Sequence, residues 1–294
     1  MKLSLSSTAF HYTYRDGKAV FAPEEGISRC AEAGFRHMDM NFIAAGRGNN
    51  PLTRDDWESW IRTIAENAEK NGITVGQTHA CWWMHKLEDP AVLQSTENMV
   101  FRSLQASSML GERPWVSVHT FSRYDEQSYD AKGTLDYNYD LLCRLGDYAE
   151  KIGVRLAVEN VFLIENAIDY AARAEELAEL VAKLNAPIYG ICWDFGHANM
   201  AKVDHLQALD IVKPYLRVVN ANDNKAKTDE HGVPFFGTVP WEKVMKKLKE
   251  IGYEGDLNLT VRTFAQTSNP KMQTEALKML HRVGTELIDI YDQA

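Results

Sequence analysis

The strongest constraint on the fold is a regular alternation, along the whole chain, of short apolar runs and longer amphipathic stretches. The apolar runs are rich in β-branched and aromatic residues, as β-strands are. The stretches between them place apolar residues at i, i+3 and i+4, which is the spacing of one helix face. Strands that alternate with helices in this way form a parallel sheet with helical crossovers. The eight apolar runs are KLSLSS, FRHMDMNF, TVGQTHACW, PWVSVHTF, VRLAVENV, PIYGICWDF, LRVVNAN and GDLNLTV.

Glycine and proline mark where several of the helices end. The apolar spacing predicts helices over residues 57–71, 136–152, 174–184 and 241–251. Glycine is common just after a helix, because it accepts the left-handed backbone that closes the last turn. It stands there at Gly72, Gly153 and Gly252, and Pro187 follows the third of these helices.

Eight strand–helix units in 294 residues suit one closed (β/α)8 TIM barrel, a fold of typically about 250 residues. We therefore predict an α/β protein with a single barrel domain over residues 1–294. A doubly wound open sheet is the main competing fold. Neither G-x-G-x-x-G nor G-x-x-x-x-G-K-[ST] follows the first strand, so we expect no nucleotide cofactor.

Charge and cysteine content limit the partners and the compartment. The chain carries 32 Lys and Arg against 41 Asp and Glu, a formal charge of −9, and has no dense basic run. Non-specific nucleic-acid binding rests on Lys and Arg contacts to phosphates, so we expect no nucleic-acid partner. The four cysteines are scattered without C-x-x-C spacing, and no apolar run approaches the roughly 20 residues that cross a bilayer. We predict a cytoplasmic protein with no membrane partner.

Polar residues at the predicted strand ends are the candidate site, because TIM-barrel chemistry occurs at the C-terminal ends of the strands. A single His or Asp at such a position is as often a loop cap as a functional group. Glu159 is different, because it follows the apolar residues LAV and a buried carboxylate needs a partner, a metal or a raised pKa. The residues at the ends of the second to seventh strands are Asp39, Asn41, His79, His119, Glu159, Asn160, Asp194, His197, Asn220 and Asn222.

Several segments together resemble the sugar phosphate isomerase/epimerase family of xylose isomerase-like TIM barrels. They are AGFRHMDMNF, QTHA, LAVEN, YGICWDFGHAN, VNANDN with the later DEH, and GYEGDLNL, between about Ala33 and Thr260. The resemblance implies an enzyme that moves protons on a small-molecule sugar or sugar phosphate, with the help of a divalent ion. It does not indicate which sugar.

The resemblance also implies a metal site, and this chain departs from it. The family's ion is held by Glu, Asp, His and Glu from strands five to eight. The first two are present as Glu159 and Asp194, but the histidine position is Asn220 and the last glutamate position is Thr260. Neutral oxygens bind hard cations weakly, so we expect at most weakly held Mg²⁺ or Mn²⁺ here and no tightly held transition metal. Without an ion, repulsion should raise one carboxylate pKa and leave an acid/base pair of Glu159 and Asp194.

A second set of residues offers an alternative zinc site. In endonuclease IV-like relatives of this barrel, an additional zinc is held by residues that correspond to His197, Asp229 and His231, all present here. The D-x-H spacing lets the two loop side chains point the same way. A solvated loop turn is the competing interpretation, and the acidic charge opposes a DNA-repair function.

The remaining candidates are substrate contacts. By resemblance, His79, His119 and His197 contact sugar hydroxyls, and Asn220 faces the same site. The indole of Trp82, close after His79, suits stacking on a sugar ring. Arg262 places a cation near the end of the eighth strand, where it could pair with a carboxylate or bind a substrate carboxylate or phosphate.

Three functions remain open from the sequence. The one we favour is a sugar isomerase or epimerase with a degenerate divalent-metal site. The second is a metal-independent dehydratase or lyase of a sugar derivative, and the third is a non-catalytic sugar-binding or partner protein. The sequence also leaves open whether the chain forms a homo-oligomer.

Overall fold

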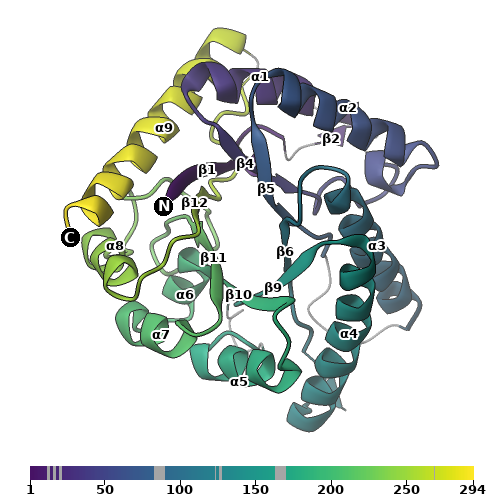
Figure 1. The fold of residues 1–294 in the computed structure, drawn as a ribbon. Helices are drawn as coiled ribbons and strands as arrows, with labels where there is room; N and C mark the ends of the chain where they lie inside the picture. The colour runs from purple at the N-terminus through teal and green to yellow at the C-terminus, as the bar shows by residue number, and fades with distance from the viewer. Residues whose placement is uncertain are drawn as a thin grey trace.

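The eight apolar runs each supply one strand of a closed parallel barrel, which confirms the predicted (β/α)8 fold and excludes the open sheet (Figure 1). The computed structural model describes residues 1–11, 14–15, 18–19, 22–82, 90–122, 124–125, 128–162, 170–267 and 269–294. Around the barrel the strands follow the order β1-β12-β11-β10-β9-β6-β5-β4. They are β1 (Lys2–Ser6), β4 (His37–Asn41), β5 (Thr74–His79), β6 (Trp115–Val118), β9 (Arg155–Glu159), β10 (Tyr189–Asp194), β11 (Leu216–Ala221) and β12 (Asp256–Leu259).

Helices surround this barrel on its outside (Figure 1). Two-stranded sheets and 3-10 turns occur in the connections: β2 (Tyr14–Arg15) with β3 (Lys18–Ala19), β7 (Tyr124–Asp125) with β8 (Ser128–Tyr129), η1 (Ser7–Ala9) and η2 (Pro51–Thr53). The helices are α1 (Pro23–Ala33), α2 (Trp57–Lys70), α3 (Pro90–Ser108), α4 (Ala131–Ile152), α5 (Ala174–Leu184), α6 (Phe195–Met200), α7 (His205–Val212), α8 (Trp241–Glu250) and α9 (Pro270–Asp292).

The predicted helix ends agree closely with these bounds, with one exception. The glycines after α2 and α4 have the left-handed φ expected of them, +64° at Gly72 and +76° at Gly153. However, α4 begins at Ala131, whereas the predicted helix began at residue 136. The Asp130 side chain accepts a hydrogen bond from the Gly133 amide at 2.8 Å and so caps the first turn of the helix. None of the described helices combines the length and the apolar character that a membrane crossing requires.

The interior of the barrel is unusually polar. TIM barrels commonly fill this space with layers of branched apolar side chains. Here the Asn220 carbonyl oxygen accepts hydrogen bonds from Gln77 at 3.1 Å and Asn258 at 3.0 Å. Because β5 and β11 are not neighbours in the barrel, the Gln77 bond crosses the interior. The side chains below the strand ends are therefore fixed by amide hydrogen bonds as well as by packing.

Candidate active site

A cavity of about 220 Å³ opens at the C-terminal ends of the barrel strands. It is the place that the fold predicts for a site. The predicted site residues that line it are Asn41, His79, Trp82, His119, Glu159, His197, Asn220, Asp229, His231, Thr260 and Arg262, and Arg47 lines it as well. Asp194 is not among the lining residues.

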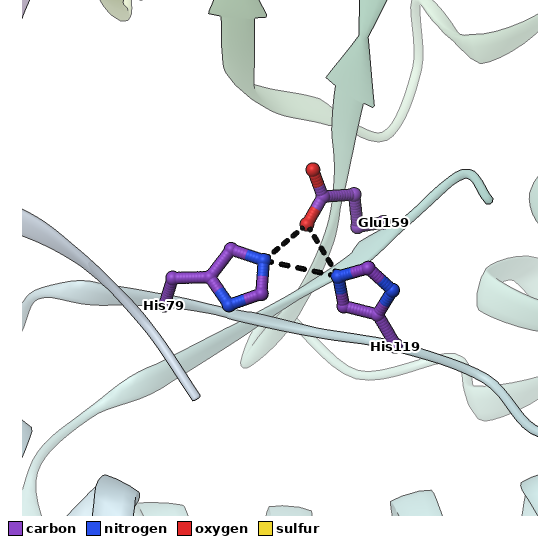
Figure 2. A group of neighbouring side chains, drawn as sticks. All are labelled: His79, His119 and Glu159. Atoms are coloured by element: carbon purple, nitrogen blue, oxygen red, sulfur yellow. Dashed lines mark hydrogen bonds and ion pairs between the residues drawn. The ribbon is translucent and has the colours of Figure 1, made fainter. Parts of the chain in front are cut away.

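One wall of the cavity carries a cluster of two imidazoles and one carboxylate (Figure 2). The Oε2 atom of Glu159, at the end of β9, lies 2.8 Å from Nε2 of His79 and 3.1 Å from Nε2 of His119. The two Nε2 atoms are 3.0 Å apart. The cluster forms because β5, β6 and β9 are neighbours in the barrel and each carries one member at or just beyond its end.

Burial and mutual charge give the three groups different protonation states. Burial alone would lower the pKa of His79, but the Glu159 carboxylate outweighs it and raises that pKa to about 9. Burial dominates at His119 and lowers its pKa to about 4, despite the same carboxylate. Burial would raise the pKa of Glu159, but the two imidazoles hold it well below its usual range. Near neutral pH the cluster therefore holds one imidazolium, one neutral imidazole and one carboxylate.

Asn220 holds the other oxygen of this carboxylate. Its Nδ2 donates to Oε1 of Glu159 at 2.7 Å, and its carbonyl already accepts the bonds from Gln77 and Asn258. Thr260, the other substituted position, accepts a hydrogen bond from Nδ2 of Asn222 at 2.9 Å. Asn220 thus offers its amide nitrogen to the site and keeps its oxygen occupied. The absence of a tightly held ion at the family's usual position stays a prediction.

A second cluster comes from α6 and the loop after β11. Oδ1 of Asp229 lies 3.2 Å from Nε2 of His231 and 3.9 Å from Nε2 of His197. Burial would raise the pKa of Asp229, but His231 foremost, with His197 and Arg262, holds it far below its usual range. The guanidinium of Arg262 lies 3.3 Å from Oδ2 of Asp229. The structure thus brings the sequence-predicted zinc set together.

Asp194 is buried beside this second cluster and is already engaged. Its Oδ1 accepts from the His197 amide at 2.8 Å and so caps α6, and its Oδ2 accepts from Nδ2 of Asn222 at 2.7 Å. Its carboxylate also lies within 4.8 Å of the nearest ring nitrogens of His197 and His231. The predicted rise of one carboxylate pKa falls on Asp194, although burial, and only to a lesser extent Glu159, causes it. Its assignment to catalysis remains a prediction.

Both clusters have the chemistry that a divalent ion requires. Nδ1 of His79, His197 and His231 each lies 2.8–2.9 Å from a backbone carbonyl oxygen. In the neutral ring this tautomer leaves the Nε2 lone pair available to an ion, as in metal-ligating histidines. His79 must first release the proton that it carries near neutral pH. In addition, Oε2 of Glu159 and Oδ1 of Asp229 receive no aligned hydrogen bond from any described residue.

Distances also favour the first cluster as a metal site. Tetrahedral Zn²⁺ with ligand bonds of about 2.0–2.1 Å places neighbouring ligand atoms about 3.3 Å apart. The three contacts among His79, His119 and Glu159 are 2.8, 3.0 and 3.1 Å, so the atoms would separate by only a few tenths of an ångström. The residues therefore fit a divalent ion at this cluster better than at the Asn220 and Thr260 positions.

Three features of the site go beyond the sequence interpretation. His79 and His119 both contact Glu159, which their positions on adjacent strands could have indicated; their role as sugar ligands stays a prediction. Trp82 stacks one face on the His119 ring, with 4.6 Å between centroids and 24° between planes, and its stacking on a sugar ring stays a prediction. Arg47 lies in the loop after β4, and no motif marks it in the sequence.

Comparison with known proteins gives one family match and several structural matches. A family model described as xylose isomerase-like TIM barrel matches residues 27–283. Uncharacterized protein MJ1311 of Methanocaldococcus jannaschii is 31% identical over 127 residues, which are 42% of this chain and 43% of that protein. The match thus spans less than half the length of this curated relative.

Solved structures match over nearly the whole chain. A D-tagatose 3-epimerase-like protein has a TM-score of 0.75 at 21% identity, with 100% of this chain and 99% of that one covered. D-psicose 3-epimerase with D-tagatose, from Clostridium cellulolyticum H10, has a TM-score of 0.74 at 17% identity, with 98% and 99% covered. At these identities the likeness is one of fold.

Proposed function

The chain belongs to the xylose isomerase-like TIM barrel family, and we propose that it is a sugar isomerase or epimerase that moves a proton between positions on a carbohydrate. The observation that carries this proposal is the Glu159 cluster. A carboxylate held ionised between two imidazoles, His79 and His119, lines a cavity at the catalytic end of the barrel. The epimerases named among the structural matches support the reaction class.

Glu159 and the histidines would carry the proton. The amide of Asn220 fixes one carboxylate oxygen of Glu159, which leaves the other directed toward His79 and His119. A proton taken from a sugar C–H by Glu159 can then be shared with the neutral His119 ring. An epimerase must also return a proton to the opposite face of the carbon, and the separate His197–Asp229–His231 cluster offers a second carrier.

A divalent ion fits this proposal at the histidine clusters. His79, His119 and Glu159 would hold it at the first cluster, and His197, Asp229 and His231 at the second. When bound, such an ion supplies Lewis-acid polarisation of a substrate carbonyl or hydroxyl oxygen. Imidazole nitrogens favour Zn²⁺, Mn²⁺ or a similar ion over Mg²⁺.

Two guanidinium groups point to a substrate with an anionic end. Arg47 and Arg262 both line the cavity. Arg262 lies against the Asp229 carboxylate, and Arg47 donates to the Trp82 carbonyl oxygen at 3.1 Å. A planar guanidinium binds phosphate or carboxylate through paired hydrogen bonds, so we propose a sugar phosphate or sugar acid in preference to a neutral sugar.

A second candidate function is metal-dependent hydrolysis of a phosphate ester. The observation in its favour is that the two clusters adjoin, with ring centroids of His119 and His197 only 6.2 Å apart. Two ions held side by side can stabilise both the attacking and the leaving oxygen of such a reaction.

Proton transfer can be measured directly by incubating the protein in D₂O with a panel of ketoses, aldoses and their phosphates, with and without added Zn²⁺ or Mn²⁺. The proposal predicts deuterium at one sugar carbon and a new epimer or isomer by NMR, both lost in Glu159→Gln. Phosphate release without exchange would establish the hydrolase instead. Loss of water or C–C cleavage would indicate a dehydratase or lyase, and saturable binding without reaction would indicate a binding protein.

A further inference from the structure

A second cavity, of about 540 Å³, lies at the opposite end of the barrel. It is bounded by the first residues of β6, β9 and β11 and by the loop before β12. Three cationic side chains line it, Arg155, Lys213 and Arg217, against one carboxylate, Glu254. This excess of positive charge contrasts with the formal charge of −9 on the whole chain.

Arg155 is held in place without being neutralised. Its Nε and Nη2 donate to the Arg113 carbonyl oxygen at 3.0 and 2.7 Å, and its guanidinium lies 4.2 Å from the centre of the Trp115 ring. Neither contact carries a full negative charge. Arg113 itself has a left-handed φ of +50°, a conformation that is unfavourable for a residue other than glycine.

The neighbouring charges that act on the pKa of Arg155 are both positive. Burial lowers the pKa of Arg155, and the neighbouring charges of Arg113 and Arg217 lower it further. Within the ranges that the structure describes, no carboxylate forms an ion pair with Arg113, Arg155, Arg217 or Lys213. Arg217 donates to the carbonyl oxygens of Leu216 and Pro214, which again leaves its charge uncompensated.

A bound anion would relieve the repulsion among these cations. Like charges at a half-buried position repel, whereas an oxyanion between two guanidinium groups forms short, charge-assisted hydrogen bonds to both. The rim has room for one small ligand, and the acidic surface elsewhere opposes a nucleic-acid strand. The Trp115 face is covered by Arg155, which leaves no open indole for a nucleobase.

We propose that this second cavity binds the phosphate group of a small phosphorylated molecule through Arg155, Arg217 and Lys213. The site lies at the other end of the strands from Glu159, so it is distinct from the proposed active site. A ligand bound there contacts the starts of β9 and β11, the strands whose other ends carry Glu159 and Asn220.

Calorimetric titration of the purified protein with inorganic pyrophosphate tests this site. We expect saturable binding, weakened about tenfold or more in Arg217→Gln and in Arg155→Gln, as expected for loss of a charge-assisted contact. Lys213→Gln, at an exposed position, should weaken binding in the same direction. Arg36→Gln is the matched control, because Arg36 likewise donates to two backbone carbonyls but lies outside the cavity; it should bind within twofold of the wild type.

Arg155→Gln could disturb folding, since Arg155 holds the Arg113 loop, so Arg217→Gln and Lys213→Gln decide the question independently. Parallel titrations with inorganic phosphate, a sugar phosphate and a nucleoside diphosphate distinguish the free anion from the two kinds of phosphorylated molecule. Absence of saturable binding to every probe would overturn the proposal. Binding that is equally strong in wild type, Arg217→Gln and Lys213→Gln would overturn it too, since the anion would then lie elsewhere.

Discussion

The two histidine clusters differ from the Asn220 and Thr260 positions in the hydrogen bonds that their polar atoms make. In the clusters, the Nε2 atoms of His79, His197 and His231 face the cavity because Nδ1 is tied to the backbone. At the family's usual metal position, by contrast, the amides of Asn220 and Asn222 occupy the oxygens. Where the resemblance implies an imidazole, the Asn220 amide belongs to a hydrogen-bond network. The ability of a site to bind a metal ion therefore depends on which lone pairs are not used in hydrogen bonds. The number of polar residues at the site does not predict this ability.

The largest effect should come from Glu159→Gln, which removes the charge that the first cluster shares. We expect turnover to fall by about 10²–10⁴-fold, because a general base is lost while the side-chain shape is kept. Steady-state kinetics on the identified substrate measures this. Glu176→Gln is the matched control, since that carboxylate accepts a backbone hydrogen bond away from the cavity. Near-wild-type turnover in Glu159→Gln would reassign Glu159 to structure.

The double change Asn220→His with Thr260→Glu should restore the ligands that the family resemblance implies. These two positions should then bind a metal ion as the histidine clusters are proposed to do. We expect affinity for Mn²⁺ or Zn²⁺ to rise by roughly tenfold or more, because an imidazole and a carboxylate replace neutral donors. Competition with a metal indicator measures this affinity. Thr260→Glu alone should give less, since the Asn220 amide would still hold Glu159. Equal affinity in the double variant and the wild type would count against this explanation.

Asp194→Asn tests whether the engaged carboxylate is chemical or structural. In the variant an amide NH₂ must face either the His197 amide or Nδ2 of Asn222, both donors. We expect the free energy of unfolding to fall by about 1–2 kcal/mol, together with loss of activity. Asp204→Asn is the control, because Asp204 also caps a helix and Asn caps equally well. If Asp194→Asn keeps its turnover, the residue serves only to hold α6.

The last effect concerns the pH dependence of the free energy of unfolding, and it should distinguish ion-free from ion-loaded protein. In the ion-free protein the pKa of His79 is raised to about 9, against about 6.5 in an unfolded chain. This stabilising contribution is fully present below about pH 6.5 and is lost as the pH rises through 9, and it is on the order of 3 kcal/mol. Denaturant unfolding at several pH values measures it. A curve that stays the same in His79→Gln would contradict the assignment.

The fold and the place of the site were predictable, because each rests on a regular pattern. Apolar runs that are separated by helix-length stretches determine the strands. The C-terminal ends of parallel strands lie together at one end of the barrel. The alternation of side chains also brought Asp229 and His231 together, as the D-x-H spacing indicated. The sequence did not predict how the individual polar side chains are oriented in the site.

Three arrangements depend on that direction. The shared contact of His79 and His119 with one oxygen of Glu159 requires knowing how far each ring reaches across neighbouring strands. The orientation of the Asn220 amide depends on Gln77, which is distant in sequence and lies across the barrel. Arg47 reaches the cavity from a loop whose path no local pattern specifies.

The central claim is that any ion this protein retains is held by the histidine clusters and not at the usual four positions. Elemental analysis after dialysis against a mild chelator tests it directly on the wild type, His79→Gln, His231→Gln and Thr260→Val. We predict a transition metal in the wild type, less of it in each histidine variant, and wild-type content in Thr260→Val. A metal content that falls in Thr260→Val but is unchanged in both histidine variants would contradict the claim.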